Sequence, residues 1–193
     1  MTNTAEKKRR VVFLDRDGVI NRDSPLYIKR WEEFEFLPRS IEAIRRLNEN
    51  GFEIIVITNQ SAIGRRFITA ETLEGMHRRM LEQIRRQGGD VLDIFYCPHR
   101  PEDNCDCRKP RPGLIQQACR RHTVRAAESI MAGDSAKDIE CARNAGCAAA
   151  VLVRTGNGIS AKTVLDRKNV PIDYVAEDLY GAAEWIINKS FKF

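Results

Sequence analysis

Asp15, Asp17 and Gly18 directly follow four apolar residues at positions 11–14. Such a run predicts a short, fully buried strand. Ligands of an α/β sheet bind beyond the carboxyl ends of its strands, so a substrate would reach the two acids there. Neighbouring carboxylates repel each other unless a cation lies between them, and Mg²⁺ prefers oxygen ligands of this kind. An isolated Asp-x-Asp-Gly run also fits a plain polar turn.

Further polar side chains follow two other predicted strands, at 52–57 and 129–132. Thr58 comes after the first of these strands and Asp134 after the second, while Lys109 lies between them. Phosphoryl transfer needs an in-line nucleophile, a divalent cation, and donors for the equatorial oxygens. A carboxylate can serve as the nucleophile through an aspartyl phosphate. Singly, these residues also fit a turn, a surface lysine and a helix cap; their joint occurrence favours phosphoryl transfer.

Four soft or borderline metal ligands lie close together in the chain, in the pattern Cys97-Pro98-His99 and Cys105-Asp106-Cys107. Such a set suits a closed, tetrahedral structural Zn²⁺ site. Exposed thiols or a redox pair are the alternatives. The segment leads straight into Arg108, so a zinc site there would hold the following residues in place.

Helical and strand-like patterns alternate along the chain, which predicts βαβ units. The fold class is therefore α/β: a doubly wound, mainly parallel sheet with helices on both faces. We expect a single domain over residues 1–193, with 1–10 as a basic arm. Predicted strands are 11–14, 52–57, 91–96, 129–132, 148–153 and 174–175; predicted helices are 40–50, 70–87 with Thr69 as N-cap, 113–122, 137–145 and 178–188.

Composition limits the class of protein. The 193 residues are 42% hydrophobic and 31% charged, with a net charge of +5, as in ordinary globular proteins. No apolar run approaches the roughly 20 residues of a membrane span, and no signal peptide is evident, which predicts a cytoplasmic protein without membrane contact. A disulfide framework is not expected there, and Cys119, Cys141 and Cys147 are interpreted as core residues. No basic-aromatic surface predicts nucleic-acid binding.

The motifs Asp15-Arg16-Asp17-Gly18, Thr58-Asn59-Gln60, Lys109 and Gly133-Asp134-x-x-x-Asp138 together resemble the four motifs of the haloacid dehalogenase (HAD) superfamily of phosphatases. The resemblance covers nearly all of residues 11–157 and implies an HAD-like, Rossmannoid fold. It implies that Asp15 attacks phosphorus and that Asp17 is the general acid and base. It also implies Mg²⁺ bound by Asp15, the Asp17 carbonyl and Asp134, with Thr58 and Lys109 stabilising the phosphoryl group. Asp138 is expected to orient Lys109 or the metal site.

The cysteine segment resembles the subgroup that contains D-glycero-D-manno-heptose-1,7-bisphosphate 7-phosphatase and histidinol-phosphate phosphatase. Thr58-Asn59-Gln60-Ser61 favours the heptose enzyme, which removes the 7-phosphate on the route to nucleotide-activated heptose and the lipopolysaccharide core. Histidinol phosphate is the alternative substrate. Ala62 and Arg66 stand where the heptose pattern usually has glycine, and Val19 where it has threonine, which leaves substrate and anomer choice open. Predicted substrate contacts are Arg108, Asn59, Gln60 and Ser61; Arg65 and Arg66 are weaker candidates.

The segments after the first two strands are short for a folded cap domain. We therefore expect a half-open site without a large cap, shaped by the loop 22–31 and the zinc-binding loop, in a monomer that acts on a small phosphorylated sugar. A phosphoacceptor signalling module is a candidate from another class, but its acids, threonine and lysine should follow in a different order. A zinc-stabilised nucleic-acid binder is a second rival, which salt-dependent DNA affinity would support.

Overall fold

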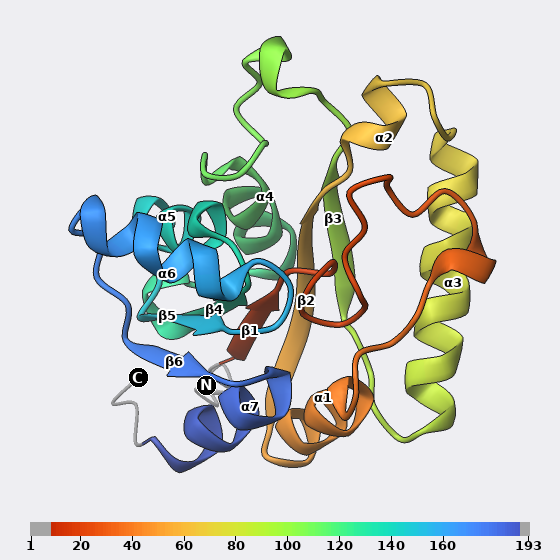
Figure 1. Cartoon of the computed structure of the whole chain (residues 1–193). Helices are drawn as coiled ribbons and strands as arrows, with labels where there is room; N and C mark the ends of the chain where they lie inside the picture. The colour runs from red at the N-terminus through yellow and green to blue at the C-terminus, as the bar shows by residue number, and fades with distance from the viewer. Residues whose placement is uncertain (1–8, 190–193) are drawn as a thin grey trace, which may run out of the picture.

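A six-stranded sheet lies at the centre of the molecule (Figure 1). The computed structural model describes residues 9–189. All neighbouring strands run parallel, in the order β3-β2-β1-β4-β5-β6. The strands are β1 (Arg10–Leu14), β2 (Phe52–Asn59), β3 (Asp93–Cys97), β4 (Ser129–Gly133), β5 (Ala149–Val153) and β6 (Tyr174–Ala176).

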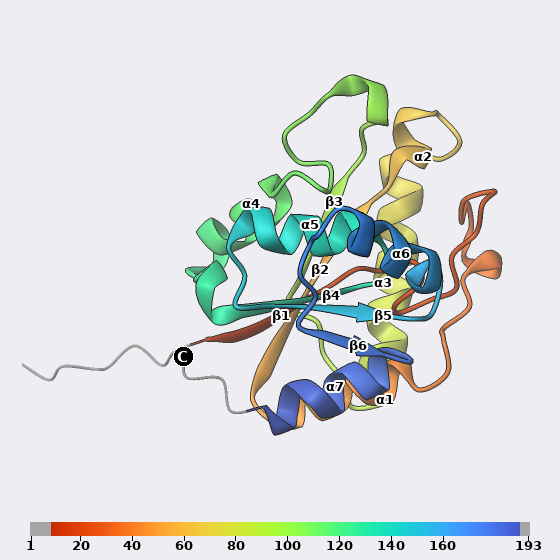
Figure 2. The ribbon, with the colours of Figure 1, turned by 60° about the vertical axis from the view of Figure 1, so that its left-hand side comes forward.

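Helices cover both faces of this sheet (Figure 2). Val12 and Leu14 of β1 pack in one core cluster, and Val11 and Phe13 pack in the other. Because alternate residues of a strand point to opposite faces, a strand covered on both sides must be apolar throughout. One face carries α1 (Ser40–Glu49), α3 (Ala70–Arg86) and α7 (Leu179–Asn188); the other carries α4 (Gly113–His122), α5 (Ala136–Ala145) and α6 (Gly158–Arg167).

The strand order reverses between β1 and β4. From β1 the chain builds outward through β2 and β3, and it then returns to place β4 on the other side of β1. Such a reversal opens a crevice at the carboxyl ends of the two strands, where ligands of this fold class bind. The phosphoacceptor alternative fits less well, because the flavodoxin-like order of such modules is 2-1-3-4-5. The predicted doubly wound parallel sheet is confirmed.

The predicted helix cap and most of the predicted core residues are confirmed. Thr69 is the N-cap of α3, and its hydroxyl accepts a hydrogen bond from the Thr72 N–H (3.2 Å). Met76 and Met80 of α3 are buried core residues, as expected. Among the other cysteines, Cys141 and Cys147 are buried, whereas Cys119 is only half-buried.

Some elements were missed by the sequence analysis or begin at other residues than expected. The turn predicted at residues 155–158 is present at 155–157, but helix α6, which was not predicted, begins at Gly158. A short helix, α2 (Ser61–Gly64), was not expected. Strand β3 begins at Asp93 rather than residue 91, since its ladder with β2 starts there. The loop 20–36 contains a 3-10 turn, η1 (Trp31–Glu33), and two others are η2 (Pro101–Asp103) and η3 (Ala126–Glu128).

The predicted basic arm 1–10 lies outside the described residues up to residue 8. Within residues 9–189, the chain forms no helix with the length and apolar composition of a membrane span.

Candidate active site

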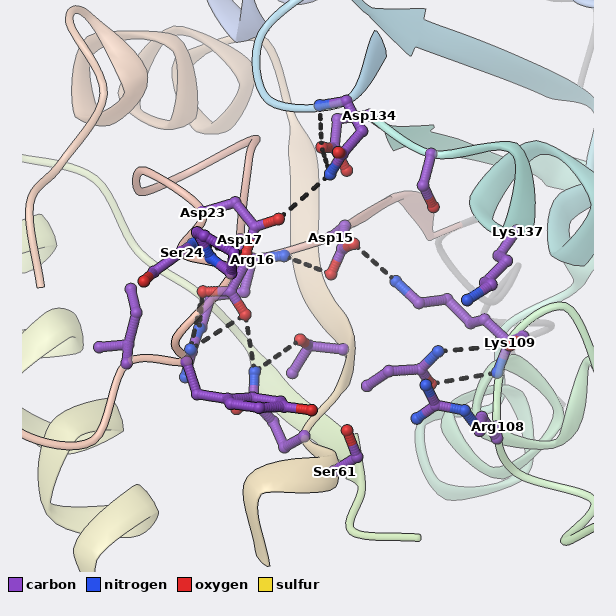
Figure 3. A pocket seen from close by; sticks show the side chains of 18 of the residues that line it. Asp15, Arg16, Asp17, Asp23, Ser24, Ser61, Arg108, Lys109, Asp134 and Lys137 are labelled. Atoms are coloured by element: carbon purple, nitrogen blue, oxygen red, sulfur yellow. Dashed lines mark hydrogen bonds and ion pairs between the residues drawn. The ribbon is translucent and has the colours of Figure 1, made fainter. Parts of the chain in front are cut away.

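A cavity of about 490 Å³ opens at the carboxyl ends of β1, β2 and β4 (Figure 3). The loop 22–31 contributes Tyr27 and Ile28 to its wall, as expected of a segment that shapes the site. The predicted catalytic and substrate-binding side chains all line this cavity: Asp15, Asp17, Thr58, Asn59, Gln60, Ser61, Arg108, Lys109 and Asp134.

Lys109 is held by three acceptors. Its Nζ lies 2.9 Å from Asp15 Oδ2 and 2.6 Å from Asp138 Oδ1, and it donates a 2.8 Å hydrogen bond to the Ile57 carbonyl. The lysine is 2% exposed and Asp138 is completely buried. An ammonium has three N–H groups, so its orientation is fully fixed. The opposite charges of the two acids raise the pKa of Lys109, although burial alone would lower it.

Asp134 occupies a niche made by glycines. Its Oδ2 accepts hydrogen bonds from the backbone N–H (2.8 Å) and the side-chain amide (3.2 Å) of Asn157. A Cβ atom at Gly18 or Gly156 would collide with the carboxylate. Both glycines also have positive φ, of 80° and 57°, which other residues rarely adopt. The glycine after the Asp15-x-Asp17 motif therefore makes room for an acid that lies over a hundred residues later in the chain.

Three carboxylates meet around Asp15. Ligand atoms of Asp15, Asp134 and Asp138 all lie within 4.8 Å of one another. Burial, followed by the charge of Asp138, raises the pKa of Asp134 to about 7. The same two causes raise the pKa of Asp15 well above its ordinary value. Lys109 supplies only one compensating charge, so the cluster favours a further cation.

Asp17 lies on the other side of Asp15 from Lys109 (Figure 3). Its carboxylate accepts hydrogen bonds from Arg16 Nη2 (2.7 Å), Gln60 Nε2 (2.8 Å) and Asn21 Nδ2 (2.9 Å). Burial raises the pKa of Asp17, but the Arg16 charge and the hydrogen bonds outweigh it and lower the pKa overall. The side chain is thus kept apart from the carboxylate cluster.

The end of β2 supplies polar groups with two different uses. The Thr58 hydroxyl accepts from Gln60 Nε2 (3.0 Å). The Asn59 amide pairs with the backbone of Lys109, accepting from its N–H (3.1 Å) and donating to its carbonyl (3.3 Å). Asn59 therefore joins β2 to the Lys109 segment, a contact that its prediction as a substrate ligand did not include.

Sequence reasoning missed Lys137, which lines the cavity from the start of α5. It lies on the same side of Asp15 as Arg108 and Lys109 (Figure 3). Its position in the first turn after the Asp134 strand end was the available signal. The weaker candidates Arg65 and Arg66 are not among the residues lining this cavity.

Ala62 and Arg66, two departures from the heptose pattern, lie away from the cavity wall. Ala62 is 1% exposed and packs in the core. Arg66 has a φ of 61°, which explains why a glycine suits this position. Neither residue is in a position to contact a substrate inside the cavity.

The predicted cysteine–histidine ligands form a second cluster. Cys97 Sγ lies 3.2 Å from Cys107 Sγ and 3.5 Å from Cys105 Sγ, and His99 Nδ1 lies 3.3 Å from Cys107 Sγ. All three cysteines are free. Their sulfurs are far beyond the roughly 2.05 Å of a disulfide. The donor set and its compactness fit a tetrahedral metal ion, whose ligand atoms would be roughly 3.5–3.8 Å apart for zinc.

Comparisons with known proteins agree with this geometry. A HAD-hydrolase-like family model matches residues 106–182. D-glycero-beta-D-manno-heptose-1,7-bisphosphate 7-phosphatase of Pseudomonas aeruginosa is 48% identical over 151 residues, 78% of this chain and 84% of the relative. The enzyme of the same name from Bordetella bronchiseptica is 39% identical over 181 residues, 94% of this chain and 99% of the relative. The chain belongs to the heptose-1,7-bisphosphate 7-phosphatase family.

A solved structure from this heptose phosphatase family has the same architecture. The D,D-heptose 1,7-bisphosphate phosphatase of B. bronchiseptica, complexed with magnesium and phosphate, aligns with a TM-score of 0.86 at 40% identity, covering 92% of this chain and 98% of that one. The HAD-like fold and the resemblance to the heptose phosphatases are both confirmed.

Proposed function

We propose that this chain hydrolyses the 7-phosphate of D-glycero-D-manno-heptose 1,7-bisphosphate, through an aspartyl phosphate on Asp15 and with Mg²⁺. The observation that carries the proposal is the buried contact of Asp15 with Lys109 beside Asp134, at the point where the strand order reverses. The names of the relatives supply the substrate, and the cavity supplies groups for its two phosphates.

Asp15 is placed to attack phosphorus. Its Oδ1 accepts the backbone N–H of Arg16 (2.7 Å), while Oδ2 contacts Lys109. These contacts hold the carboxylate in one orientation before the substrate binds, which lowers the entropic cost of the attack. The attack forms an Oδ–phosphorus bond and breaks the bond to the sugar oxygen, which takes a proton from Asp17. The negative charge of the bound phosphate favours the protonated form of Asp17, against the effect of Arg16. Water, deprotonated by Asp17, then cleaves the acyl phosphate and restores Asp15.

Thr58 and Lys109 stabilise the phosphoryl group between these steps. Thr58 is 1% exposed, and its hydroxyl lies at the cavity wall beside Gln60. Lys109 brings a fixed positive charge to the same side as the attacking carboxylate. Charged and hydroxyl donors that are already oriented need no rearrangement as charge spreads over the equatorial oxygens.

Asp15, Asp134 and the backbone carbonyl of Asp17 are the proposed Mg²⁺ ligands. The raised pKa values of Asp15 and Asp134 fit this assignment, because a bound divalent cation would compensate the burial and the repulsion that disfavour their charged forms. Asp138 is already bound to Lys109 and to Ser135, so we leave it out of the metal's ligand set. Magnesium would neutralise charge on the phosphoryl oxygens and orient the ester.

Cys97, His99, Cys105 and Cys107 are proposed to bind structural Zn²⁺. Burial, together with the hydrogen bonds and charges of Cys97 and Cys105, raises the pKa of the Cys107 thiol, so three adjacent thiolates require a cation. The loop continues into Arg108, whose Nη1 donates to the His99 carbonyl (3.2 Å). Zinc would therefore hold Arg108 at the cavity rim without taking part in hydrolysis.

Arg108 and Lys137 provide the charge for the distal phosphate of the substrate. Both line the cavity on the side of Lys109. Gln60 and Ser61 are proposed to contact the sugar between the two phosphates, and Asn59 supports them by its bonds to Lys109. The predicted monomeric state, cytoplasmic location and absence of nucleic-acid binding stay predictions.

The test is kcat/KM with Mg²⁺ for both anomers of heptose 1,7-bisphosphate and for histidinol phosphate. We expect a preference of about a hundredfold or more for a heptose bisphosphate, and among the anomers for the β form named in both curated relatives. Reaction on histidinol phosphate with equal or higher kcat/KM would contradict the substrate assignment while leaving the mechanism intact.

A further inference from the structure

A histidine lies buried behind the proposed general acid, outside the residues assigned above. His77 is 6% exposed and belongs to α3. Its Nε2 is 3.2 Å from Nη1 of Arg16, which is itself 1% exposed. A guanidinium is always protonated and has no acceptor, so His77 must accept this hydrogen bond through an unprotonated Nε2. Burial and the Arg16 charge lower the pKa of His77 to about 3, which agrees with a neutral ring.

The same guanidinium holds the carboxylate of Asp17. Arg16 donates from Nε to Asp17 Oδ1 (3.1 Å), and from Nη2 to Oδ1 (2.7 Å) and Oδ2 (3.0 Å). The guanidinium is planar, so the direction of Nη1 determines the direction of the two groups on Asp17. Fixing Nη1 on His77 thus fixes the plane in which Asp17 is bound.

The position of His77 is set by the core and not by the cavity. It lies on the buried stripe of α3 between Met76 and Met80, and its ring packs edge-on against Tyr96 (6.1 Å between centroids). It is not among the residues that line the cavity. Because packing in α3 holds His77 in place, His77 can restrain the orientation of Arg16 and, through it, of Asp17.

We propose that His77 is a positioning residue, which orients Asp17 through Arg16 so that Asp17 can protonate the leaving oxygen of the ester. This inference rests on the proposed function, because it takes Asp17 as the general acid. Without an acceptor at position 77, a buried N–H of Arg16 loses its partner and the guanidinium turns toward another one. Asp17 then remains present but is aimed less well at the bond that breaks.

The leaving group separates this role from a merely structural one. An aliphatic alkoxide needs a proton as the phosphorus–oxygen bond breaks, whereas p-nitrophenolate leaves without one. Loss of orientation at Asp17 should therefore lower kcat/KM for an aliphatic phosphate and spare p-nitrophenyl phosphate. General loosening of the site would lower both, because both esters use the same nucleophile and the same phosphoryl contacts.

The experiment compares H77L, which removes the acceptor, with H77Q, which keeps one near the place of Nε2. For H77L we expect kcat/KM on heptose 1,7-bisphosphate to fall about tenfold or more, and on p-nitrophenyl phosphate less than threefold. H77Q should recover to within about threefold of wild type on both esters. M76L, a change of similar size at the neighbouring buried position of α3, serves as the packing control and should leave both values unchanged.

A double mutant tests whether the effect passes through Asp17. In a D17N background, the further change H77L should have no effect on kcat/KM for the aliphatic ester, because the carboxyl that His77 orients is already absent. Equal losses on the two esters, no recovery in H77Q, or additive effects with D17N would each overturn the proposal. If H77L does not fold, the comparison of H77Q with H77N, whose amide is too short to reach Arg16, gives the same answer.

Failure of the substrate assignment would look different. Should wild type not hydrolyse heptose 1,7-bisphosphate, the measurements are made with another aliphatic phosphate ester that it does hydrolyse, and the leaving-group comparison is unaffected. Hydrolysis of no ester at all by wild type would overturn both proposals.

Discussion

The cysteine–histidine cluster takes its four ligands from eleven consecutive residues, whereas the carboxylates of the cavity come from positions as far apart as Asp15 and Asp138. The cysteine cluster lies in a loop and includes an exposed histidine. The acids are buried: Asp15 and Asp134 directly follow strands, and Asp138 lies in the first turn of α5. Ligands that are close in the sequence can come together through the conformation of their own loop alone. The carboxylates meet only when the whole sheet has formed.

This contrast assigns different tasks to the two clusters. Close packing of β1 against β4 brings like charges together, which is unfavourable until a cation or substrate compensates them. Such stored repulsion suits a site that must bind a metal and a phosphate. The cysteine loop also brings like charges together, but its proposed task is only to set the course of the chain into Arg108 and Lys109.

The largest effect should come from D15N. An amide cannot attack phosphorus, so we expect kcat to fall by at least about 10³-fold. Because the substitution removes one of three crowded charges, the protein should remain folded and keep its zinc content. Steady-state turnover, circular dichroism and elemental analysis measure these outcomes. Residual activity within tenfold of wild type would show that Asp15 is not the nucleophile.

D138N should have a smaller effect, of about 10–100-fold on kcat. It leaves Asp15 and Asp134 in place but removes the anion 2.6 Å from Lys109 Nζ, so the lysine is less well fixed. D166N is the matched control, since Asp166 forms an exposed ion pair with Lys162 (2.6 Å) and neither residue lines the cavity. Equal kcat values for the two variants would argue against Asp138 as the anchor of Lys109.

C107S probes the other cluster. We expect loss of bound zinc and a fall of about tenfold in kcat/KM for the heptose bisphosphate, because Arg108 loses its support. Turnover of p-nitrophenyl phosphate, which has no distal phosphate, should change much less. C119S, at a half-buried cysteine outside the cluster, is the control. A wild-type protein purified without chelators that contains no zinc would refute the zinc assignment.

The difference between the clusters also explains how far sequence reasoning reached. The cysteine ligands and the Asp15-x-Asp17 motif are short-range patterns, so their residues could be named before the fold was known. The prediction that Thr58, Lys109 and Asp134 converge needed only the rule that parallel strands end at one edge. In the structure these side chains line one cavity.

Other residues gave no comparable signal. Among 32 lysines and arginines, nothing in the sequence indicates that Arg16 is buried. Lys137, which lines the cavity, has only the weaker signal of its place in the first turn after the Asp134 strand end. His77 could have been noticed, because it falls on the apolar stripe of its helix between Met76 and Met80. Helix α6 was missed since only two of its side chains, Ala161 and Leu165, are buried on an apolar face.

The last prediction concerns how the carboxylate cluster makes the stability of the folded protein depend on pH, which the cysteine cluster should not do. In the folded protein the pKa of Asp134 is about 7, above the roughly 3.9 of an unfolded chain. The folded state therefore binds the proton more tightly. The stabilisation is complete below about pH 4 and is lost as the pH rises through 7, so Tm should fall over this range.

Magnesium should stabilise the folded protein most at high pH, where the proton on Asp134 is lost. It replaces the proton at the cluster, so its effect on Tm should be larger at pH 8 than at pH 5. Thermal unfolding with and without Mg²⁺ measures this in buffers free of chelators, which would also remove zinc. D134N should flatten the pH dependence and weaken the response to Mg²⁺, whereas C107S should retain both. A response to magnesium that is the same at the two pH values would mean that Asp134 does not hold the proton that the metal displaces.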